Sequence, residues 1–231
     1  MLELGHRGAE MIQLSNVSKY YRVKNDRHYV LDNVSVSFPP NTSIGILGRN
    51  GAGKSTLLRM LGGMEYPNKG KVKVSGSISW PVGLSSGFQG SLTARENIKF
   101  VCQIFGKSIT ERNEIVHYVQ DFAEIGKHFD MPIKTYSSGM KGRVNFGLSM
   151  AFDFDYYLVD EVTGVGDKRF KEKAKAAFDE KRKNASVIMV SHDMNSLRQN
   201  CDMGIYLKGD GQLSIYDDIE IAIKKYSSNG K

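Results

Sequence analysis

Residues 48–56 have the residue types and the spacing of a phosphate-binding P-loop. The glycines allow the backbone to turn closely, so that successive N–H groups can point at phosphate oxygens. Lys54 can reach the β- and γ-phosphates of a nucleotide, and Ser55 can bind magnesium. A glycine-rich turn with a chance Lys-Ser pair is the alternative, but the segments on both sides fit a strand–loop–helix unit and favour the P-loop. The predicted phosphate-binding residues are Gly48, Asn50, Gly51, Gly53, Lys54, Ser55 and Thr56.

Two carboxylates follow an apolar segment at residues 156–159. Asp160, at a strand end beside a P-loop, can hold a magnesium ion. Glu161 is then placed to polarise the water that attacks the γ-phosphate. An Asp-Glu pair after a strand is by itself often an ordinary surface pair. The P-loop upstream in the same chain favours the catalytic interpretation.

A polar, glycine-containing segment at residues 136–143 precedes a helical pattern. Ser137 and Gly139 make a short flexible turn, and the helix is predicted to begin at Met140. A helix N-terminus is a favourable place for an anion. Serine is also a common N-cap residue, so an anion site and a plain helix cap both remain open from these residues alone.

A histidine follows the apolar segment at residues 187–190. At a strand end near a γ-phosphate, His192 can donate a hydrogen bond to that phosphate or orient the attacking water. A lone histidine more often has a structural role. Its position directly after a buried strand favours the functional interpretation.

The elements that position these residues alternate between strand and helix patterns, which predicts an α/β core. Short alternating segments near the N-terminus indicate antiparallel strands, and a long helical stretch between the P-loop and the next apolar strand indicates an inserted helical subdomain. The predicted strands are 11–14, 30–38, 44–47, 71–74, 77–80, 156–159 and 187–190, and a hairpin is predicted over 203–215 with its turn at 209–211. Three helical segments are predicted: one that begins at residue 57, one over 93–150 with breaks at Gly106, Gly126 and Pro132, and one over 168–183.

The composition excludes several classes of protein. The 231 residues are 40% hydrophobic, which allows a real core, and the net charge of +7 is compatible with a phosphate-handling protein, an anionic membrane surface or nucleic acid. Cys102 and Cys201 have no CxxC spacing, so no disulfide framework or zinc site is predicted. No uncharged apolar run reaches the roughly 18 residues that span a bilayer. We therefore expect a protein on the cytosolic side, linked to a membrane through a partner.

Taken together and in this order, the four motifs resemble the ATP-binding subunits of ABC transporters, over residues 11 to 226. The resemblance implies a RecA-like P-loop core, an antiparallel β subdomain and a helical subdomain, with ATP and Mg2+ as ligands. In that family two subunits pair head to tail and sandwich ATP between them. Ser137 and Gly139 would therefore act on the ATP of the partner copy. Tyr21, or else Tyr20, is suited to stack on adenine, with a buried aromatic as the alternative.

Several positions depart from the family pattern. In the signature motif Tyr136, Ser138 and Met140 replace the usual residues, and Val162 replaces the proline after the catalytic glutamate. In the next loop Asp167 is the expected acid. The metal-binding glutamine of the Q-loop is assigned to Gln89, the only glutamine near that place, although counting back along the motif puts Leu84 at the usual position.

With these departures, the sequence resembles that of the capsular polysaccharide exporters of Gram-negative bacteria. The segments that carry this resemblance are 79–84, 87–97, 129–140 and 159–167. Related O-antigen exporters often carry an additional C-terminal carbohydrate-binding domain, and we expect none here, because the sequence ends soon after the predicted hairpin. We expect a single ABC ATPase domain over residues 1–231, with a helical subdomain at about 84–150.

The resemblance implies an ATPase subunit that powers export of a lipid-linked capsular polysaccharide across the inner membrane, from its cytoplasmic face. The implied partners are a second copy of the chain, a polytopic membrane permease, and periplasmic and outer-membrane export proteins, without nucleic acid. The alternatives are an O-antigen or teichoic-acid exporter, a soluble ABC ATPase acting on ribosomes or DNA, and a regulatory cassette that does not hydrolyse ATP. The presence of both Glu161 and His192 argues against the last of these.

Overall fold

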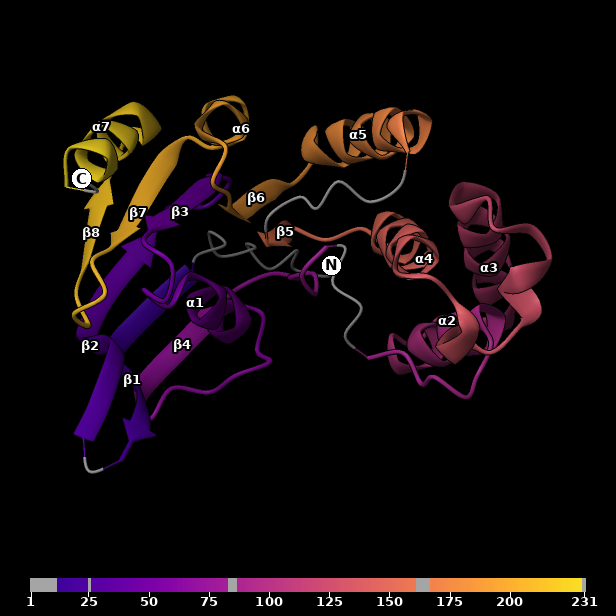
Figure 1. Cartoon of the computed structure of the whole chain (residues 1–231), viewed down its shortest axis with the longest axis horizontal. Helices are drawn as coiled ribbons and strands as arrows, with labels where there is room; N and C mark the ends of the chain where they lie inside the picture. The colour runs from indigo at the N-terminus through magenta and orange to yellow at the C-terminus, as the bar shows by residue number, and fades with distance from the viewer. Residues whose placement is uncertain (1–11, 25, 83–86, 161–166, 230–231) are drawn as a thin grey trace, which may run out of the picture. The chain divides into compact units, whose positions relative to one another are not determined.

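The computed structural model describes residues 12–24, 26–82, 87–160 and 167–229, which divide between two compact units (Figure 1). The first unit contains the β-strands with α1, α6 and α7, and the second contains α2 to α5 with two short 3-10 helices. In chain order the elements are β1 Ile12–Val23, β2 Asp26–Phe38, β3 Ile44–Gly48, α1 Lys54–Leu61, β4 Lys69–Val74, α2 Ala94–Ile104, α3 Ile109–Ala123, 3-10 helices Gly126–Asp130 and Ile133–Thr135, α4 Ser138–Met150, β5 Tyr156–Asp160, α5 Lys168–Arg182, β6 Ser186–Val190, α6 Met194–Asn200, β7 Met203–Leu207, β8 Leu213–Tyr216 and α7 Ile219–Asn229.

A three-stranded antiparallel sheet with the order β2-β1-β4 forms one layer of the first unit. The predicted antiparallel strands are present, but β1 and β2 are longer than their sequence patterns indicate. The rings of Tyr20 and Tyr29 lie 5.2 Å apart across the two strands, and the guanidinium of Arg27 lies 4.7 Å from the Tyr20 ring. These cross-strand contacts stabilise pairing over residues that lie outside the strands predicted at 11–14 and 30–38.

A five-stranded sheet with the order β5-β6-β3-β7-β8 forms the second layer. The strands β5, β6, β3 and β7 are parallel, and β8 pairs with β7 in the antiparallel direction. Buried residues occupy the whole of β3, β6 and β7, as expected for parallel strands that are covered on both faces. The predicted hairpin is confirmed, and its turn glycines Gly209 and Gly211 have φ values of 91° and 87°.

Helix α1 packs against strands of both sheets, and the two sheets and this helix share one hydrophobic core (Figure 1). Helices α6 and α7 cover the other face of the five-stranded sheet. Gly204 of β7 allows α7 to approach closely, because a Cβ at that position would lie 2.3 Å from the Cβ of Ala222. The sequence patterns did not predict α6 or α7.

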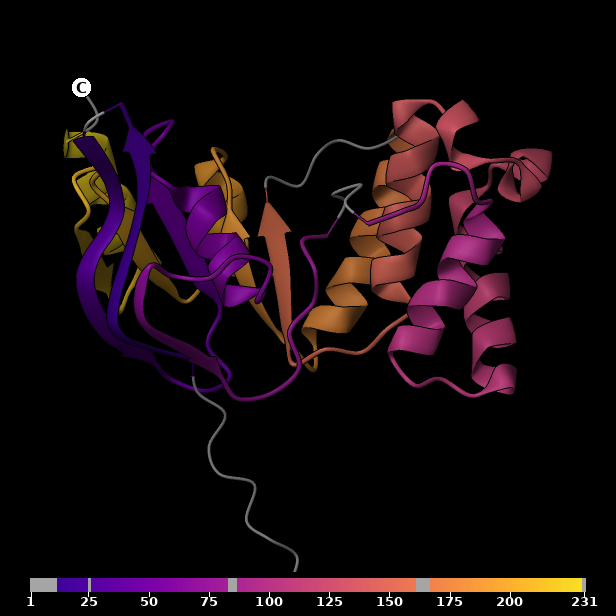
Figure 2. The ribbon, with the colours of Figure 1, turned by 90° about the horizontal axis from the view of Figure 1, so that it is seen from below.

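The second unit is helical, as predicted for residues 93–150. Helix α2 packs on α3, α3 on α4 and α4 on α5 (Figure 2). Helices α2 and α3 each begin with a capping box, formed by Thr93 with Glu96 and by Ser108 with Glu111. Helix α5 confirms the helix predicted at 168–183.

Three predictions of local structure are wrong. Helix α1 begins at Lys54 rather than at residue 57. The segment Ser77 to Trp80 is not a strand; its only ladder contact among the described residues is a single bridge between Ile78 and Tyr156. The carboxylate of Asp155 accepts hydrogen bonds from both the backbone N–H and the hydroxyl of Ser77, which removes these groups from strand pairing. Helix α4 begins at Ser138 rather than Met140, because the Ser137 side chain already caps it.

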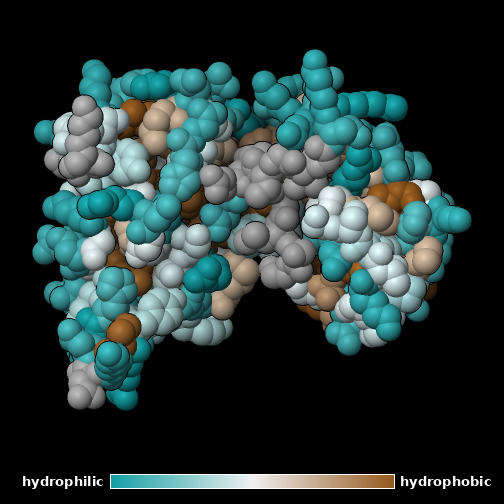
Figure 3. Space-filling view, viewed as in Figure 1, coloured by the Kyte–Doolittle hydropathy of each residue, from teal (hydrophilic) through white to brown (hydrophobic). Residues whose placement is uncertain are grey.

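None of the described helices is long and apolar enough to cross a membrane. Hydrophilic side chains predominate on the face of each unit seen in Figure 3, with small and separate hydrophobic patches between them.

Candidate functional site

The P-loop connects the end of β3 to the start of α1. Gly53 is the residue before the helix, and its φ of 97° and ψ of 14° place it in the left-handed region. Glycine adopts that conformation without steric cost. The first N–H groups of a helix have no partner within that helix, so the N-terminus of α1 is available to an anion.

Lys54 is the first residue of α1, and only 8% of it is exposed. Its Nζ donates hydrogen bonds to the carbonyl oxygens of Gly48 at 2.8 Å and Arg49 at 3.1 Å. The lysine thus folds back over its own loop. A bound phosphate offers the ammonium group a stronger, charge-assisted acceptor.

The carboxyl ends of three neighbouring parallel strands meet at this site. Gly48 ends β3, Asp160 ends β5, and His192 follows Val190 at the end of β6. Because β6 lies between β5 and β3, these residues share one edge of the sheet. Ligands of α/β proteins bind at that edge.

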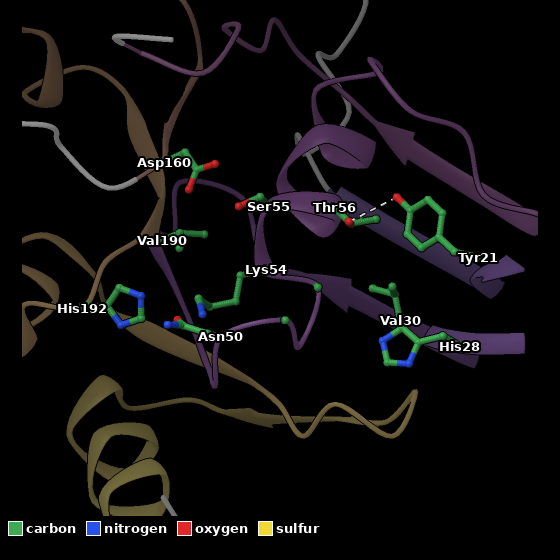
Figure 4. Close-up of a pocket in the computed structure, with 12 residues that line it drawn as sticks. Tyr21, His28, Val30, Asn50, Lys54, Ser55, Thr56, Asp160, Val190 and His192 are labelled. Atoms are coloured by element: carbon green, nitrogen blue, oxygen red, sulfur yellow. Dashed lines mark hydrogen bonds between the residues drawn. The ribbon is translucent and has the colours of Figure 1, made fainter. Parts of the chain in front are cut away.

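A cavity of about 400 Å³ opens at this edge and is lined by residues of the first unit (Figure 4). Asp160 and His192 lie on one side of it, and Tyr21 and His28 lie on the opposite side. The lining residues are Tyr21, His28, Val30, Asn50, Gly51, Gly53, Lys54, Ser55, Thr56, Asp160, Val190 and His192. The structure therefore brings together the predicted P-loop residues, the strand-end aspartate, the strand-end histidine and one predicted aromatic residue. Gly48 contributes its carbonyl to the loop rather than a surface to the cavity.

The donor set of this cavity fits a magnesium ion bound together with a nucleotide. The Ser55 hydroxyl and the Asp160 carboxylate line the same cavity and are oxygen donors. The described residues hold no group of three or more His, Cys, Asp or Glu side chains that could bind a metal by themselves. Mg2+ is usually held by one or two side chains together with water and substrate phosphates, so this sparse set suits it.

The structure favours Tyr21 over Tyr20 for the base. Tyr21 lines the cavity and is 40% exposed. The ring of Tyr20 is instead engaged by Tyr29 and Arg27. The Tyr21 hydroxyl donates to Glu65 and lies 3.3 Å from Oγ1 of Thr56, so the ring is tied to the P-loop helix (Figure 4).

Sequence reasoning missed His28 and Val30 as lining residues. His28 pairs with Tyr21 across the β1–β2 ladder, which places both beside the cavity. Only the register of the β1–β2 pairing could have indicated that His28 lies beside Tyr21. The predicted strands covered 11–14 and 30–38 and included neither Tyr21 nor His28, so that register was not available.

Ser137 and Gly139 lie in the second unit, at the N-terminus of α4. They line a separate hollow together with Glu124, Ile125, His128, Met140 and Arg143. The Ser137 hydroxyl accepts a hydrogen bond from the backbone N–H of Met140 at 3.2 Å, so the serine is a helix cap. Tyr136, an unusual residue for the signature motif, is 5% exposed and donates its hydroxyl to the carbonyl of His128, which anchors the segment.

Two further site residues were predicted, Glu161 and Gln89. Glu161 lies outside the described residues, as does Leu84. Gln89 belongs to the second unit and is exposed, and its backbone N–H donates to Oδ1 of Asn97 at 2.7 Å. The roles of Glu161 and Gln89 therefore remain predictions.

Comparison with known proteins decides the family. The family model described as ABC transporter matches residues 31–164, which is more than half of the chain. The chain belongs to the ABC transporter family. Membership implies that the P-loop cavity binds ATP.

Similar proteins include the polysialic acid transport ATP-binding protein KpsT of Escherichia coli, which is 53% identical over 216 residues, covering 94% of this chain and 96% of that protein. The capsule polysaccharide export ATP-binding protein CtrD of Neisseria meningitidis serogroup B is 43% identical, covering 94% of this chain and 99% of that protein. The ATP-binding cassette MJ0796, solved as a dimer with ADP and Pi, superposes with a TM-score of 0.73 at 25% identity, covering 90% of this chain and 98% of that one. The predicted α/β ABC ATPase fold is thereby confirmed.

Proposed function

We propose that this chain is the ATP-hydrolysing subunit of an exporter that moves a lipid-linked capsular polysaccharide across the inner membrane. One observation carries the proposal. The chain matches KpsT and CtrD over almost its full length and over almost the full length of each of these proteins. They are named for transport of polysialic acid and for export of capsule polysaccharide. The cavity supports the proposal because its P-loop residues, Asp160 and His192 are of the types that bind the phosphates of ATP and its magnesium ion.

In this function different residues of the cavity bind different parts of the nucleotide. Lys54 and the P-loop N–H groups bind the phosphates, and Tyr21 contacts the adenine at the other side of the cavity. Ser55 and Asp160, with Gln89, would hold Mg2+, which neutralises phosphate charge when it is bound. Glu161 takes the proton of the attacking water, and His192 hydrogen-bonds the γ-phosphate.

We further propose that two copies of the chain assemble head to tail, with each ATP between the P-loop of one copy and Ser137 and Gly139 of the other. The local geometry of Gly139 supports a role outside its own chain. Gly139 is helical, and a Cβ built on it would have as its nearest atom Oγ of Ser137 at 3.9 Å. Nothing described in this chain requires glycine there, whereas a closely approaching partner nucleotide would.

The remaining partners follow from the same proposal. A polytopic permease carries the polymer through the membrane, the chain works at the cytoplasmic face of that membrane, and periplasmic and outer-membrane proteins complete the export route. Nucleic acid is not a partner. No described helix can cross a membrane, so energy transfer in this proposal depends on contact with the permease.

Complementation tests the proposal directly. The chain is expressed in Escherichia coli cells that lack the polysialic acid transport ATP-binding protein, and polymer on the cell surface is measured. We expect restored surface polymer with the native chain and none with Lys54→Ala, which loses a charge-assisted phosphate contact worth about 1.5–3 kcal/mol. The levels of both proteins are compared, so that missing surface polymer can be attributed to lost function rather than to lost protein.

The outcome also separates the alternatives. Polymer retained inside cells that contain the native, ATP-hydrolysing chain would contradict capsule export. Co-purification of the chain with ribosomes or DNA instead of a polytopic membrane protein would replace the proposal with a soluble ABC ATPase.

A further inference from the structure

The Glu65 carboxylate, in the loop after α1, is the centre of a polar network beside the nucleotide cavity. Nζ of Lys19 lies 2.8 Å from one carboxylate oxygen, and Nε of Arg59 lies 3.1 Å from the other. The hydroxyl of Tyr21 donates to the first oxygen. Only 20% of the Glu65 side chain is exposed, so these contacts replace most of its water.

The network connects three separate segments of the first unit. Lys19 and Tyr21 belong to β1, Arg59 belongs to the P-loop helix α1, and Glu65 belongs to the loop that follows it. Nη2 of Arg59 donates to Oγ1 of Thr56 at 3.3 Å, and the same oxygen lies 3.3 Å from the Tyr21 hydroxyl. Glu65 is thus the common acceptor of two cations and a phenol.

Glu65 is ionised throughout the physiological range. Its partial burial raises its pKa, but the hydrogen bonds from Lys19, Tyr21 and Arg59 outweigh this effect and lower the pKa to about 2. A permanent negative charge is a strong acceptor for a tyrosine hydroxyl.

The network restricts the rotamers of the Tyr21 side chain. Tyr21 is 40% exposed, and an exposed tyrosine samples several rotamers. Holding the hydroxyl fixes the direction of the ring axis beside the cavity. Because a phenol O–H prefers to lie in the plane of its ring, the position of the acceptor also favours one orientation of that plane. A ring that is already ordered loses less entropy when a base stacks on it.

We propose that Glu65 is a positioning residue for nucleotide binding, which holds Tyr21 by its hydroxyl and keeps the ring at the base end of the cavity. The inference rests on the proposed contact between Tyr21 and adenine. Lys19 and Arg59 hold the carboxylate in place, and neither they nor Glu65 lines the cavity. Glu65 therefore acts through Tyr21.

The test measures the affinity of the purified chain for ATP and for inorganic tripolyphosphate, which has neither base nor ribose. Tyr21→Phe keeps the ring and removes only the hydroxyl, Glu65→Ala removes the acceptor, and Glu65→Gln keeps an oxygen acceptor. We expect Tyr21→Phe and Glu65→Ala each to weaken ATP binding by about three- to tenfold, which corresponds to one hydrogen bond. Tripolyphosphate binding should not change, and Glu65→Gln should recover most of the ATP affinity.

The double variant Tyr21→Phe with Glu65→Ala should bind ATP no more weakly than the poorer single variant, because both changes break the same contact between the Tyr21 hydroxyl and the Glu65 carboxylate. Matched controls are Tyr66→Phe, on a neighbouring tyrosine that is 80% exposed, and Glu220→Ala, which breaks the ion pair with Arg198 outside the cavity. Neither control should change either affinity.

Each contrary result has a distinct meaning. Equal losses for ATP and tripolyphosphate, or additive losses in the double variant, overturn the positioning role. An unchanged ATP affinity in Tyr21→Phe and Glu65→Ala, together with a loss in Tyr21→Ala, overturns it while leaving Tyr21 as the base contact. An unchanged ATP affinity in Tyr21→Ala removes the base contact itself, and with it the inference. If Glu65→Ala does not fold, Tyr21→Phe carries the comparison, because it removes the hydroxyl that donates to Glu65, and an unchanged ATP affinity in this variant overturns the positioning role.

Discussion

Val30 packs directly against Gly53, so that a Cβ built on Gly53 would lie 2.2 Å from Cγ1 of Val30. The contact joins β2 of the antiparallel sheet to the P-loop turn. Gly53 also has a φ of 97°, where residues with a side chain are strained. The shape of the phosphate-binding turn therefore depends on a residue of a different sheet, 23 positions earlier in the chain.

Gly53→Ala should destabilise the chain and disrupt ATP binding. The left-handed conformation alone costs about 1–2 kcal/mol for a residue with a Cβ, and the clash with a buried valine adds to it. We expect a lower Tm and at least a tenfold loss of ATP affinity, measured by thermal unfolding and by titration.

Val30→Ala provides the control for the clash. The double variant Gly53→Ala with Val30→Ala should recover part of the Tm difference between Gly53→Ala and native, after the loss from Val30→Ala alone is subtracted, because only the strain of the turn remains. If the double variant shows purely additive losses, the contact between the two positions does not explain the requirement for glycine.

The sequence predicted that the P-loop, Asp160 and His192 lie at one edge of the sheet, because each follows an apolar run. Asp160 is the last residue of β5 and His192 follows β6, and the parallel strands place both beside the P-loop. What the sequence could not provide is the other side of the cavity. His28, Val30 and the Glu65 network are positioned by strand register and by a loop contact between distant segments, and neither leaves a periodic pattern in the chain.

Local structure was missed where a side chain replaces a backbone partner. The segment Ser77 to Trp80 has the alternating pattern of a strand. The backbone N–H and the hydroxyl of Ser77 instead donate to the carboxylate of Asp155. Helix α6 has seven residues, too few for a periodic signal, and is capped by Asp193. Such contacts link residues far apart in sequence or occupy too short a window for pattern analysis.

Asp160→Asn should abolish the dependence of ATP binding on magnesium. The amide has a similar shape but lacks the charge that, with the Ser55 hydroxyl, suits a divalent cation. Native chain should bind ATP more tightly with Mg2+ than after chelation with EDTA, whereas Asp160→Asn should bind equally in both. Asp193→Asn is the matched control, because that carboxylate caps α6 and does not line the cavity. A magnesium effect that survives in Asp160→Asn would exclude Asp160 from the metal site.

Acid should selectively weaken the contribution of Glu65 to stability. The pKa of Glu65 is lowered to about 2 from an ordinary value of 4.5. The stabilisation from its ionised form is thus fully present above pH 4.5 and is lost as the pH falls toward about 2. We expect the Tm difference between native chain and Glu65→Gln to be constant from pH 7 to 5 and to shrink below pH 4.5. A difference that does not change with pH would show that the carboxylate charge contributes nothing.

Gly139→Asp should stop ATP turnover without harming the fold. The space around Gly139 accepts a side chain, with Oγ of Ser137 as the nearest atom at 3.9 Å, and an acidic residue is favourable in the first turn of a helix. Gly139→Ala should therefore match the native Tm or exceed it slightly, and Gly139→Asp should fold equally well. In the dimer the new carboxylate would face the γ-phosphate of the other copy and repel it, so turnover should fall while ATP binding to the monomer persists. A Gly139→Asp chain that hydrolyses ATP at the native rate would remove this segment from the active site.

A mixed dimer then tests which ATP the segment serves. One copy carries Gly139→Asp and the other carries Lys54→Ala. If Gly139 acts on the ATP of the partner, both lesions fall in the same composite site, and the second site, with a native P-loop and a native signature segment, still traps one nucleotide per dimer. If Gly139 acts on the ATP of its own chain, each site carries one lesion and no nucleotide is trapped. Counting trapped nucleotides therefore distinguishes the head-to-tail arrangement from a site completed within one chain.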